Sequence, residues 1–447
     1  MKDLTVGKES KTILLFALPM LLGNLFQQSY NLIDSAIVGN YIGTEALAAV
    51  GASFPVLFVL ISLVIGVSIG ATIVISQYYG ANDIKNVKRA IDTIFITIFF
   101  ASIFITIISF VFSKEIFDLL KLPPEVVPQA ILYFKIFASG LILLFGLNAV
   151  NAILRGLGDS KTPLYFMIIS TFLNIVLDLF FVIVLKMGIE GVAYATVLAQ
   201  GIAFIIAVIY LNKYHSIIRI SFKNLTFDKD IFLKSVKIGV PTGLQQTFVA
   251  LGMMALIRIV NDFGTITLAA YTVAGRINSL AAMPAMDFSV ALTAFVGQNI
   301  GANKIHRVKK AYKATLGMTS IISIVVTAAV LLLGKQIMGL FTSDTEVISI
   351  GVSYFYIVGG FYIVLSSMFI TQGVLRGAGD TLIPMFFTLI SLWLLRIPFS
   401  YYLSREDVGL GSDGIWWGIP IAWVVGFILS YIYYLTGKWK KKVIIKR

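Results

Sequence analysis

The chain of 447 residues contains no cysteine and only two histidines. Without cysteine there can be no disulfide, no thiolate metal site and no cysteine nucleophile. The histidines, His215 and His306, both fall in basic loops, where a solvated side chain is more ordinary than a pH sensor. The apolar segments therefore lack the usual side chains for acid–base or nucleophilic chemistry, and we do not expect an enzyme.

Charged residues are also scarce. They make up 13% of the chain, against 58% hydrophobic residues, and the mean hydropathy is +0.92. A soluble globule of this length needs more charge than this to cover its surface. The sequence also has no Gly-x-x-x-x-Gly-Lys-Ser/Thr phosphate loop, so ATP is not expected to drive the protein directly.

Long apolar runs take the place of the missing charge. Each run is about 20 to 30 residues long, enough for an α-helix to cross a bilayer. We therefore predict an all-α polytopic membrane protein with twelve transmembrane helices. The runs lie near residues 12–38, 46–78, 88–112, 127–155, 162–186, 189–212, 231–259, 266–298, 306–334, 347–375, 382–404 and 414–437.

The net charge of +13 follows the predicted topology. If the N-terminus is cytoplasmic, most of the 35 lysine and arginine residues fall in cytoplasmic segments, including the run from Lys438 to Arg447. This bias predicts a multi-pass protein of the inner (cytoplasmic) membrane with both termini in the cytoplasm. The lipid bilayer explains the basic charge, so no nucleic-acid partner is expected.

A repeated phrase indicates an internal duplication. The hexapeptide LRGLGD at 154–159 returns as LRGAGD at 375–380, and the same offset of 221 positions aligns Gln77 with Gln298 in two Gln-x-x-Gly-Ala-Asn turns. The hexapeptides themselves are interpreted as helix-capping turns, because a glycine ends one helix and Asp159 or Asp380 caps the next.

The duplication predicts two lobes. Residues 1–212 form an N-lobe with helices 1–6, residues 213–230 a cytoplasmic linker, and residues 231–447 a C-lobe with helices 7–12. Because six is even, both copies enter the membrane from the same face, as parallel repeats. Rocking of one six-helix lobe against the other would expose a central cleft to each side in turn.

Deep polar residues in the first run form one candidate face. Asn24, Gln27, Asn31 and Asp34 recur three and four residues apart, so they share one side of a helix. A carboxylate inside a membrane helix costs roughly 2.5–3.5 kcal/mol on insertion scales and is seldom kept without a partner or a task.

Two further helices of the first copy place polar groups at the depth of Asp34. Asn174 and Asp178 lie one turn apart in the fifth helix, and Thr196 lies in the sixth. Two carboxylates, an amide and a hydroxyl form an all-oxygen set that suits Na⁺ or can share a proton. Alternatively, these residues make separate contacts between helices.

The second copy lacks this set. Asn174 aligns with Leu395 and Asp178 with Phe399. A different acid, Asp287, follows a proline in the eighth helix. It could recognise a cationic substrate, or it could be an ion-pair or hydrogen-bond partner at a helix kink.

The doubled twelve-helix layout, Pro19, the Gln-x-x-Gly-Ala-Asn turns and the Leu-Arg-Gly-x-Gly-Asp turns resemble the multidrug and toxic compound extrusion (MATE) family over essentially the whole chain. Asp34, Asn174, Asp178 and Thr196 resemble its DinF-like branch, in which they would form the cation or proton site of the N-lobe. The resemblance also makes Pro19 the hinge of the first helix. Residues 347–375 lack the acid of the NorM-like branch.

The resemblance implies secondary active efflux of small organic cations by antiport with H⁺ or Na⁺. Gln27, Asn31 and Asp287 are then candidates for the substrate or coupling face. We expect no cofactor beyond the coupling ion, and a monomer. The alternative is a flippase of the related superfamily for lipid-linked oligosaccharides or lipids, which should have a cationic cavity.

Overall fold

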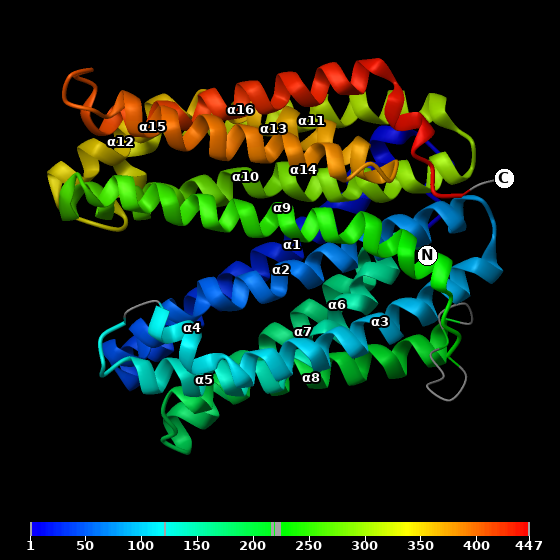
Figure 1. Ribbon diagram of the computed structural model, residues 1–447, viewed down its shortest axis with the longest axis horizontal. Coiled ribbons are helices and arrows are strands. Elements are labelled where there is room, and N and C mark those ends of the chain that lie inside the picture. The colour runs from blue at the N-terminus through cyan, green and yellow to red at the C-terminus, as the bar shows by residue number, and fades with distance from the viewer. Residues whose placement is uncertain (1, 120–121, 216–218, 220–224, 446–447) are drawn as a thin grey trace. The chain divides into compact units, whose positions relative to one another are not determined.

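In the computed structural model, residues 2–119, 122–215, 219 and 225–445 are described (Figure 1), and every regular element among them is a helix. The elements are α1 (Glu9–Ile37), η1 (Val38–Ile42), α2 (Thr44–Gly80), α3 (Ile84–Val111), α4 (Ser113–Leu119), α5 (Val127–Ser139), α6 (Leu141–Gly156), α7 (Lys161–Asp178), η2 (Leu179–Val184), α8 (Ile189–Tyr214), α9 (Lys229–Asn261), α10 (Gly264–Gly301), α11 (Ile305–Gly339), α12 (Thr345–Gly359), α13 (Tyr362–Gly377), α14 (Leu382–Leu389), η3 (Ile390–Arg396), α15 (Ile397–Leu403), α16 (Gly411–Thr436) and η4 (Lys438–Lys441).

Ten of the described helices are long and apolar enough to cross a membrane, and the number reaches twelve if each of two bent helix pairs is one span. The predicted all-α polytopic architecture is therefore confirmed. The bent pairs correct one detail, because the runs 127–155 and 347–375 were expected to be continuous. Instead, α5 and α6 meet at 51° and α12 and α13 at 50°.

The chain divides into two compact units. Unit 1 comprises Met1–Asp3 and Leu18–Gly243, and unit 2 comprises Leu4–Ala17 and Leu244–Arg447. In unit 1, α2 packs against α6, and α7 packs against α8. In unit 2, α13 packs against α10, α11 and α16. The predicted division at 212 and 231 follows the two sequence copies and stays a prediction.

The division into units falls inside α1 and inside α9, at matching places of the two copies. The chain leaves unit 2 between Ala17 and Leu18, directly before Pro19, and leaves unit 1 just after Pro241. Both prolines lie inside continuous helices. Each removes one backbone hydrogen bond there, so each marks a place where its helix bends at lower cost.

The segment before α1 is bound within unit 2 by the second Gln-x-x-Gly-Ala-Asn turn. Leu4 N–H donates to Oε1 of Gln298 at 3.0 Å, and Asn299 Nδ2 donates to the carbonyl of Leu4 at 3.1 Å. Arg307 forms an ion pair with Glu9 at 3.3 Å. This motif therefore joins the start of the first copy to unit 2, which the sequence did not suggest.

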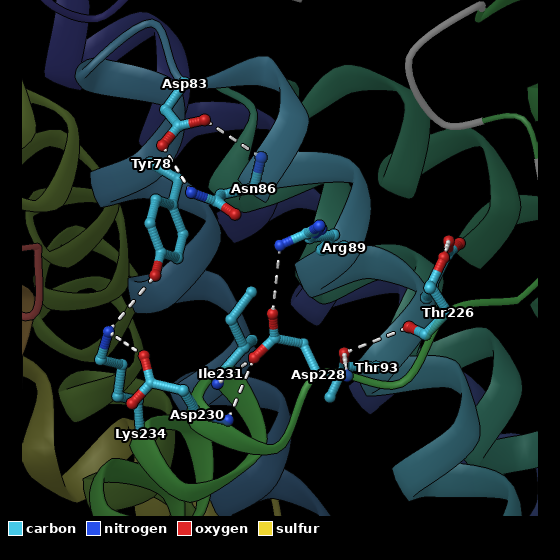
Figure 2. Close-up of polar contacts among 11 residues, drawn as sticks. Tyr78, Asp83, Asn86, Arg89, Thr93, Thr226, Asp228, Asp230, Ile231 and Lys234 are labelled. Atoms are coloured by element: carbon cyan, nitrogen blue, oxygen red, sulfur yellow. Dashed lines mark hydrogen bonds and ion pairs between the residues drawn. The ribbon is translucent and has the colours of Figure 1, made fainter.

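The end of the linker is bound within unit 1, against α3 (Figure 2). Asp228 Oδ1 accepts from the backbone N–H groups of Asp230 and Ile231, at 3.0 and 3.1 Å, and so caps α9. Its other oxygen lies 3.6 Å from Arg89, and its own N–H donates to Thr93 Oγ1 at 3.0 Å. The ion pair with Arg89 and the hydrogen bond to Thr93 therefore attach the capped start of α9 to α3.

Replacing Asp228 by alanine should lower the free energy of unfolding by about 1 kcal/mol, the usual worth of an N-cap. Asp228→Asn keeps a capping oxygen and loses only the half-exposed ion pair, so it should lower the free energy of unfolding by only about 0.3 kcal/mol. Thermal unfolding of the two variants in detergent measures the difference. Equal losses would show that the ion pair, and not the cap, stabilises this junction.

The first Leu-Arg-Gly-x-Gly-Asp turn confirms the capping interpretation. Oδ1 of Asp159 accepts from the N–H groups of Lys161 and Thr162 at 3.1 and 3.0 Å. Gly158 has φ of 81°, a left-handed conformation that glycine adopts without strain. In the second copy, Asp380 instead accepts a hydrogen bond from the Tyr433 hydroxyl at 2.6 Å.

Candidate functional site

Two carboxyl groups meet inside unit 1. Asp34 lies near the end of α1, and Asp178 is the last residue of α7, directly before the π-helical segment η2. Asp178 is fully buried, and the two side chains are in hydrogen-bonding contact. A hydrogen bond between two carboxyl groups requires one proton between them, because neither oxygen of a carboxylate is a donor.

Asn174 and Thr196 lie beside this pair. Asn174 is one turn before Asp178 in α7, and its Nδ2 donates to the Thr196 hydroxyl of α8 at 3.4 Å. The Thr196 hydroxyl donates to the carbonyl of Val192 at 3.1 Å. The structure thus brings together the four residues that the sequence singled out at similar depth. Their role as a coupling site stays a prediction.

This group has more acceptors than donors. Apart from the proton that the acid pair shares, no hydrogen-bond donor among the described residues reaches Asp34 Oδ1, Asn174 Oδ1 or either carboxyl oxygen of Asp178, although all four atoms are buried. Buried acceptors without donors cost free energy. A proton or a small cation among these oxygens removes that cost, so the donor set fits H⁺ and Na⁺ alike.

Two tyrosines lie near the acid pair and were not among the residues predicted from the sequence. Tyr30 lies one turn before Asp34 on α1, and its side chain lies close to Thr196. Tyr133 of α5 is buried and lies within electrostatic range of both carboxyl groups. Tyr30 was detectable, because it continues the helical spacing of Gln27 and Asp34. Tyr133 was not, since only the tertiary fold brings α5 to this place.

A polar cavity of about 180 Å³ adjoins the group. It reaches from Tyr30, Asn174 and Thr196 to Arg155 at the last turn of α6. Its other lining residues are mostly polar, and they are Asn24, Gln27, Leu144, Leu147, Asn148, Asn151, Met167, Ser170, Thr171 and Gln200. A polar cavity of this size holds several water molecules or part of a small polar ligand.

The other residues predicted from the sequence are not part of the acid-pair group. Gln27 lines the cavity, but Asn31 is exposed and donates to Gln28 Oε1 at 3.1 Å, so the structure does not bring it into the group. Asp287 is buried in α10 of unit 2. Pro19 lies inside α1, where the helix continues without a break.

The corresponding turn of the second copy contains no acidic residue. Leu395 and Arg396 belong to η3, and Phe399 belongs to α15. Within the described parts of the chain, no three histidine, cysteine or acidic side chains gather in a way that could hold a metal ion. The acid pair of unit 1 therefore has no counterpart at the matching position.

Up to twelve membrane-crossing helices, with a buried acid pair beside a polar cavity, define an integral membrane protein of the transporter class. The MatE family model matches the chain twice, at residues 19–180 and 241–402. The chain therefore belongs to the MatE family of multidrug and toxic compound extrusion transporters. Since both copies match one model, the predicted duplication is confirmed as well.

Relatives and solved structures agree with this assignment. The chain is 34% identical to the probable multidrug resistance protein YpnP of Bacillus subtilis, with 98% of this chain and 97% of the relative covered. It is 28% identical to the probable multidrug resistance protein NorM of Thermotoga maritima, covering 98% and 94%. An outward-facing multidrug resistance MATE transporter superposes with a TM-score of 0.92 at 27% identity, covering 99% of both chains.

One further solved structure has the same fold but a pocket of different polarity. A transporter of the same superfamily from Pyrococcus furiosus superposes with a TM-score of 0.91 at 26% identity, covering 97% of both chains. It is described as having a binding pocket of reverse polarity that suggests a different function. The substrate class of a member of this superfamily must therefore be inferred from the polarity of its pocket and not from its fold.

Proposed function

We propose that this transporter exports small organic cations in exchange for H⁺ or Na⁺, and that Asp34, Asn174, Asp178 and Thr196 hold the coupling ion. The observation that carries this proposal is the set of buried acceptor oxygens around the acid pair that lack donors. Such a set requires a positive occupant. The presence of the set in the first copy, and the absence of an acid from 347–375, support the DinF-like branch.

Exchange follows if the two cargoes use the acid pair in turn. The proton that the pair shares leaves it with one negative charge, and the pair becomes neutral and attracts an organic cation only weakly when a further proton or a Na⁺ binds. Without it, the charge favours the organic cation, whose polar groups the amides of the adjoining cavity can hold. A membrane potential of 100 mV supplies about 2.3 kcal/mol for each charge moved, enough to bias a two-state carrier.

The remaining parts of the proposal concern topology and motion. We place both termini in the cytoplasm and the protein, as a monomer, in the inner (cytoplasmic) membrane, because the basic segments favour that orientation. Pro19 is the proposed hinge of α1, supported by its place at the boundary between the two units. Asp287 and Gln27 are proposed to face the substrate.

Separate ion gradients test the coupling. Full-length protein in proteoliposomes should move ethidium, an organic cation, when a pH gradient or a Na⁺ gradient is imposed alone, and the effective gradient identifies the coupling ion. We expect at least a tenfold faster rate with the coupling gradient than without it. Equal rates with and without both gradients would contradict antiport.

One observation favours a second function. Arg155 lines the cavity of unit 1, and a cationic group suits an anionic lipid precursor better than an organic cation. A flippase for lipid-linked oligosaccharides or lipids is therefore the alternative. Binding of an anionic isoprenoid diphosphate by the purified protein, without binding of ethidium, would favour the flippase and reject the export of organic cations.

A further inference from the structure

The tail that follows α16 is folded onto unit 2. Gly437 has φ of 68° and turns the chain at the end of α16. The next two residues start η4, in which Trp439 is 1% exposed. The Trp439 ring stacks on Tyr434 with centroids 5.6 Å apart and planes 9° apart, and its Nε1 donates to the carbonyl of Tyr434 at 2.9 Å.

This anchor joins the tail to two other parts of unit 2. Tyr434 packs on Tyr312 of α11, with centroids 4.5 Å apart. Further along, the carbonyl of Lys442 lies so close to Gly379 that a Cβ there would approach it to 3.0 Å. The tail thus runs from the beginning of α11 to the second Leu-Arg-Gly-x-Gly-Asp turn. Figure 1 shows it, in red, at the end of the chain beyond α16.

The folded tail presents unneutralised positive charge. Lys438, Lys441 and Lys442 are exposed, and so are Lys309 and Lys313, which flank Tyr312 on α11. None of these five takes part in an ion pair with another described residue. The acid of the neighbouring turn, Asp380, is buried and bonded to Tyr433, and it forms no ion pair with any of these five lysines.

Apolar surface lies directly beside this charge. Ile432 is 56% exposed and Leu435 is 63% exposed, on the last turns of α16 before Lys438. A ligand that satisfies both surfaces has an anionic head and an apolar chain. An anionic phospholipid has that form, whereas free phosphate offers nothing to Ile432 and Leu435. Clusters of basic residues at the end of a membrane helix attract such lipids.

We infer that η4 and the start of α11 form a binding site for the head group of an anionic phospholipid such as phosphatidylglycerol. Lys438, Lys441 and Lys442 contact the phosphate, Lys309 and Lys313 extend the positive surface, and the acyl chains lie along α16. Trp439 is the positioning residue, because its stacking holds the lysines in place. The general positive-inside bias needs only charge, whereas this site also needs the folded tail.

Native mass spectrometry of the full-length protein, titrated with phosphatidylglycerol or with phosphatidylcholine of the same acyl chains, tests the inference. The wild type should prefer phosphatidylglycerol. Lys438→Gln, Lys441→Gln and Lys442→Gln together should remove most of the preference, by about fivefold for each lysine. The control Lys85→Gln, Lys161→Gln and Lys229→Gln removes the same charge from exposed positions of unit 1 and should keep the preference.

The anchor provides the second comparison. Trp439→Ala changes no lysine of the sequence but removes the stack that positions them, and should also lose the preference, whereas Trp439→Phe should keep it. Glycerol phosphate, which has the head group without acyl chains, should not compete. The inference is overturned if Trp439→Ala binds like the wild type, if both lysine triples act alike, or if glycerol phosphate displaces the lipid.

Discussion

Asp34→Asn is expected to reduce gradient-driven export of an organic cation at least tenfold, which is a loss of about 1.4 kcal/mol or more in coupling. Asparagine has nearly the volume of aspartate, so the packing at the end of α1 should survive. The asparagine side chain cannot take up a proton or carry a negative charge. Asp178 is then the only acid left at this contact. Asp178→Asn should have the same effect for the same reason.

The measurement is ethidium transport in proteoliposomes with the effective ion gradient imposed. A matched control is Asp118→Asn, which alters an exposed acid of α4 in the same unit and should leave the rate unchanged. All variants are compared at equal reconstitution and with unchanged thermal unfolding. An Asp34→Asn protein that folds normally and still exports ethidium at the wild-type rate under the gradient would reject the coupling role.

Gly66→Ala is expected to destabilise unit 1 by about 1–3 kcal/mol or more, because the added methyl group has no space. A Cβ on Gly66 would collide with the backbone of Gly239 and Gly243 in α9, and a Cβ on Gly239 would lie 2.9 Å from the Gly66 carbonyl. Gly70 makes the next contact along α2. Two Gly-x-x-x-Gly pairs thus cross each other, as is typical of close helix contacts in membranes.

Gly51 of the same helix is the control for this prediction. A Cβ at Gly51 would meet nothing within 4 Å, so Gly51→Ala should be neutral or should stabilise α2 by up to about 1 kcal/mol through helix propensity. Thermal unfolding of the detergent-solubilised proteins measures both changes. Equal behaviour of Gly51→Ala and Gly66→Ala would show that the crossing of α2 and α9 is not tight in the membrane protein.

Much of the candidate site was predictable, because helical spacing and depth follow directly from the sequence. Asp34, Asn174, Asp178 and Thr196 could be expected at one level since each lies a known distance along its helix. Asn31 shows the limit of this reasoning. It shares the spacing of Asp34, yet its side chain turns to Gln28, because helical neighbours three residues apart can bond to each other instead of pointing inward.

The sequence by itself determined the membrane class, the duplication and the place where the copies diverge, because length, hydropathy and repeated turns are local properties. Tertiary structure alone decided that α5 bends away from α6 and α12 from α13, that Tyr133 lies near the acid pair, and that α1 and α9 each belong to two units. Those features arise from contacts between residues far apart in the chain, such as Gly66 with Gly239. The local sequence around a residue such as Gly66 does not specify which distant helix will pack against it.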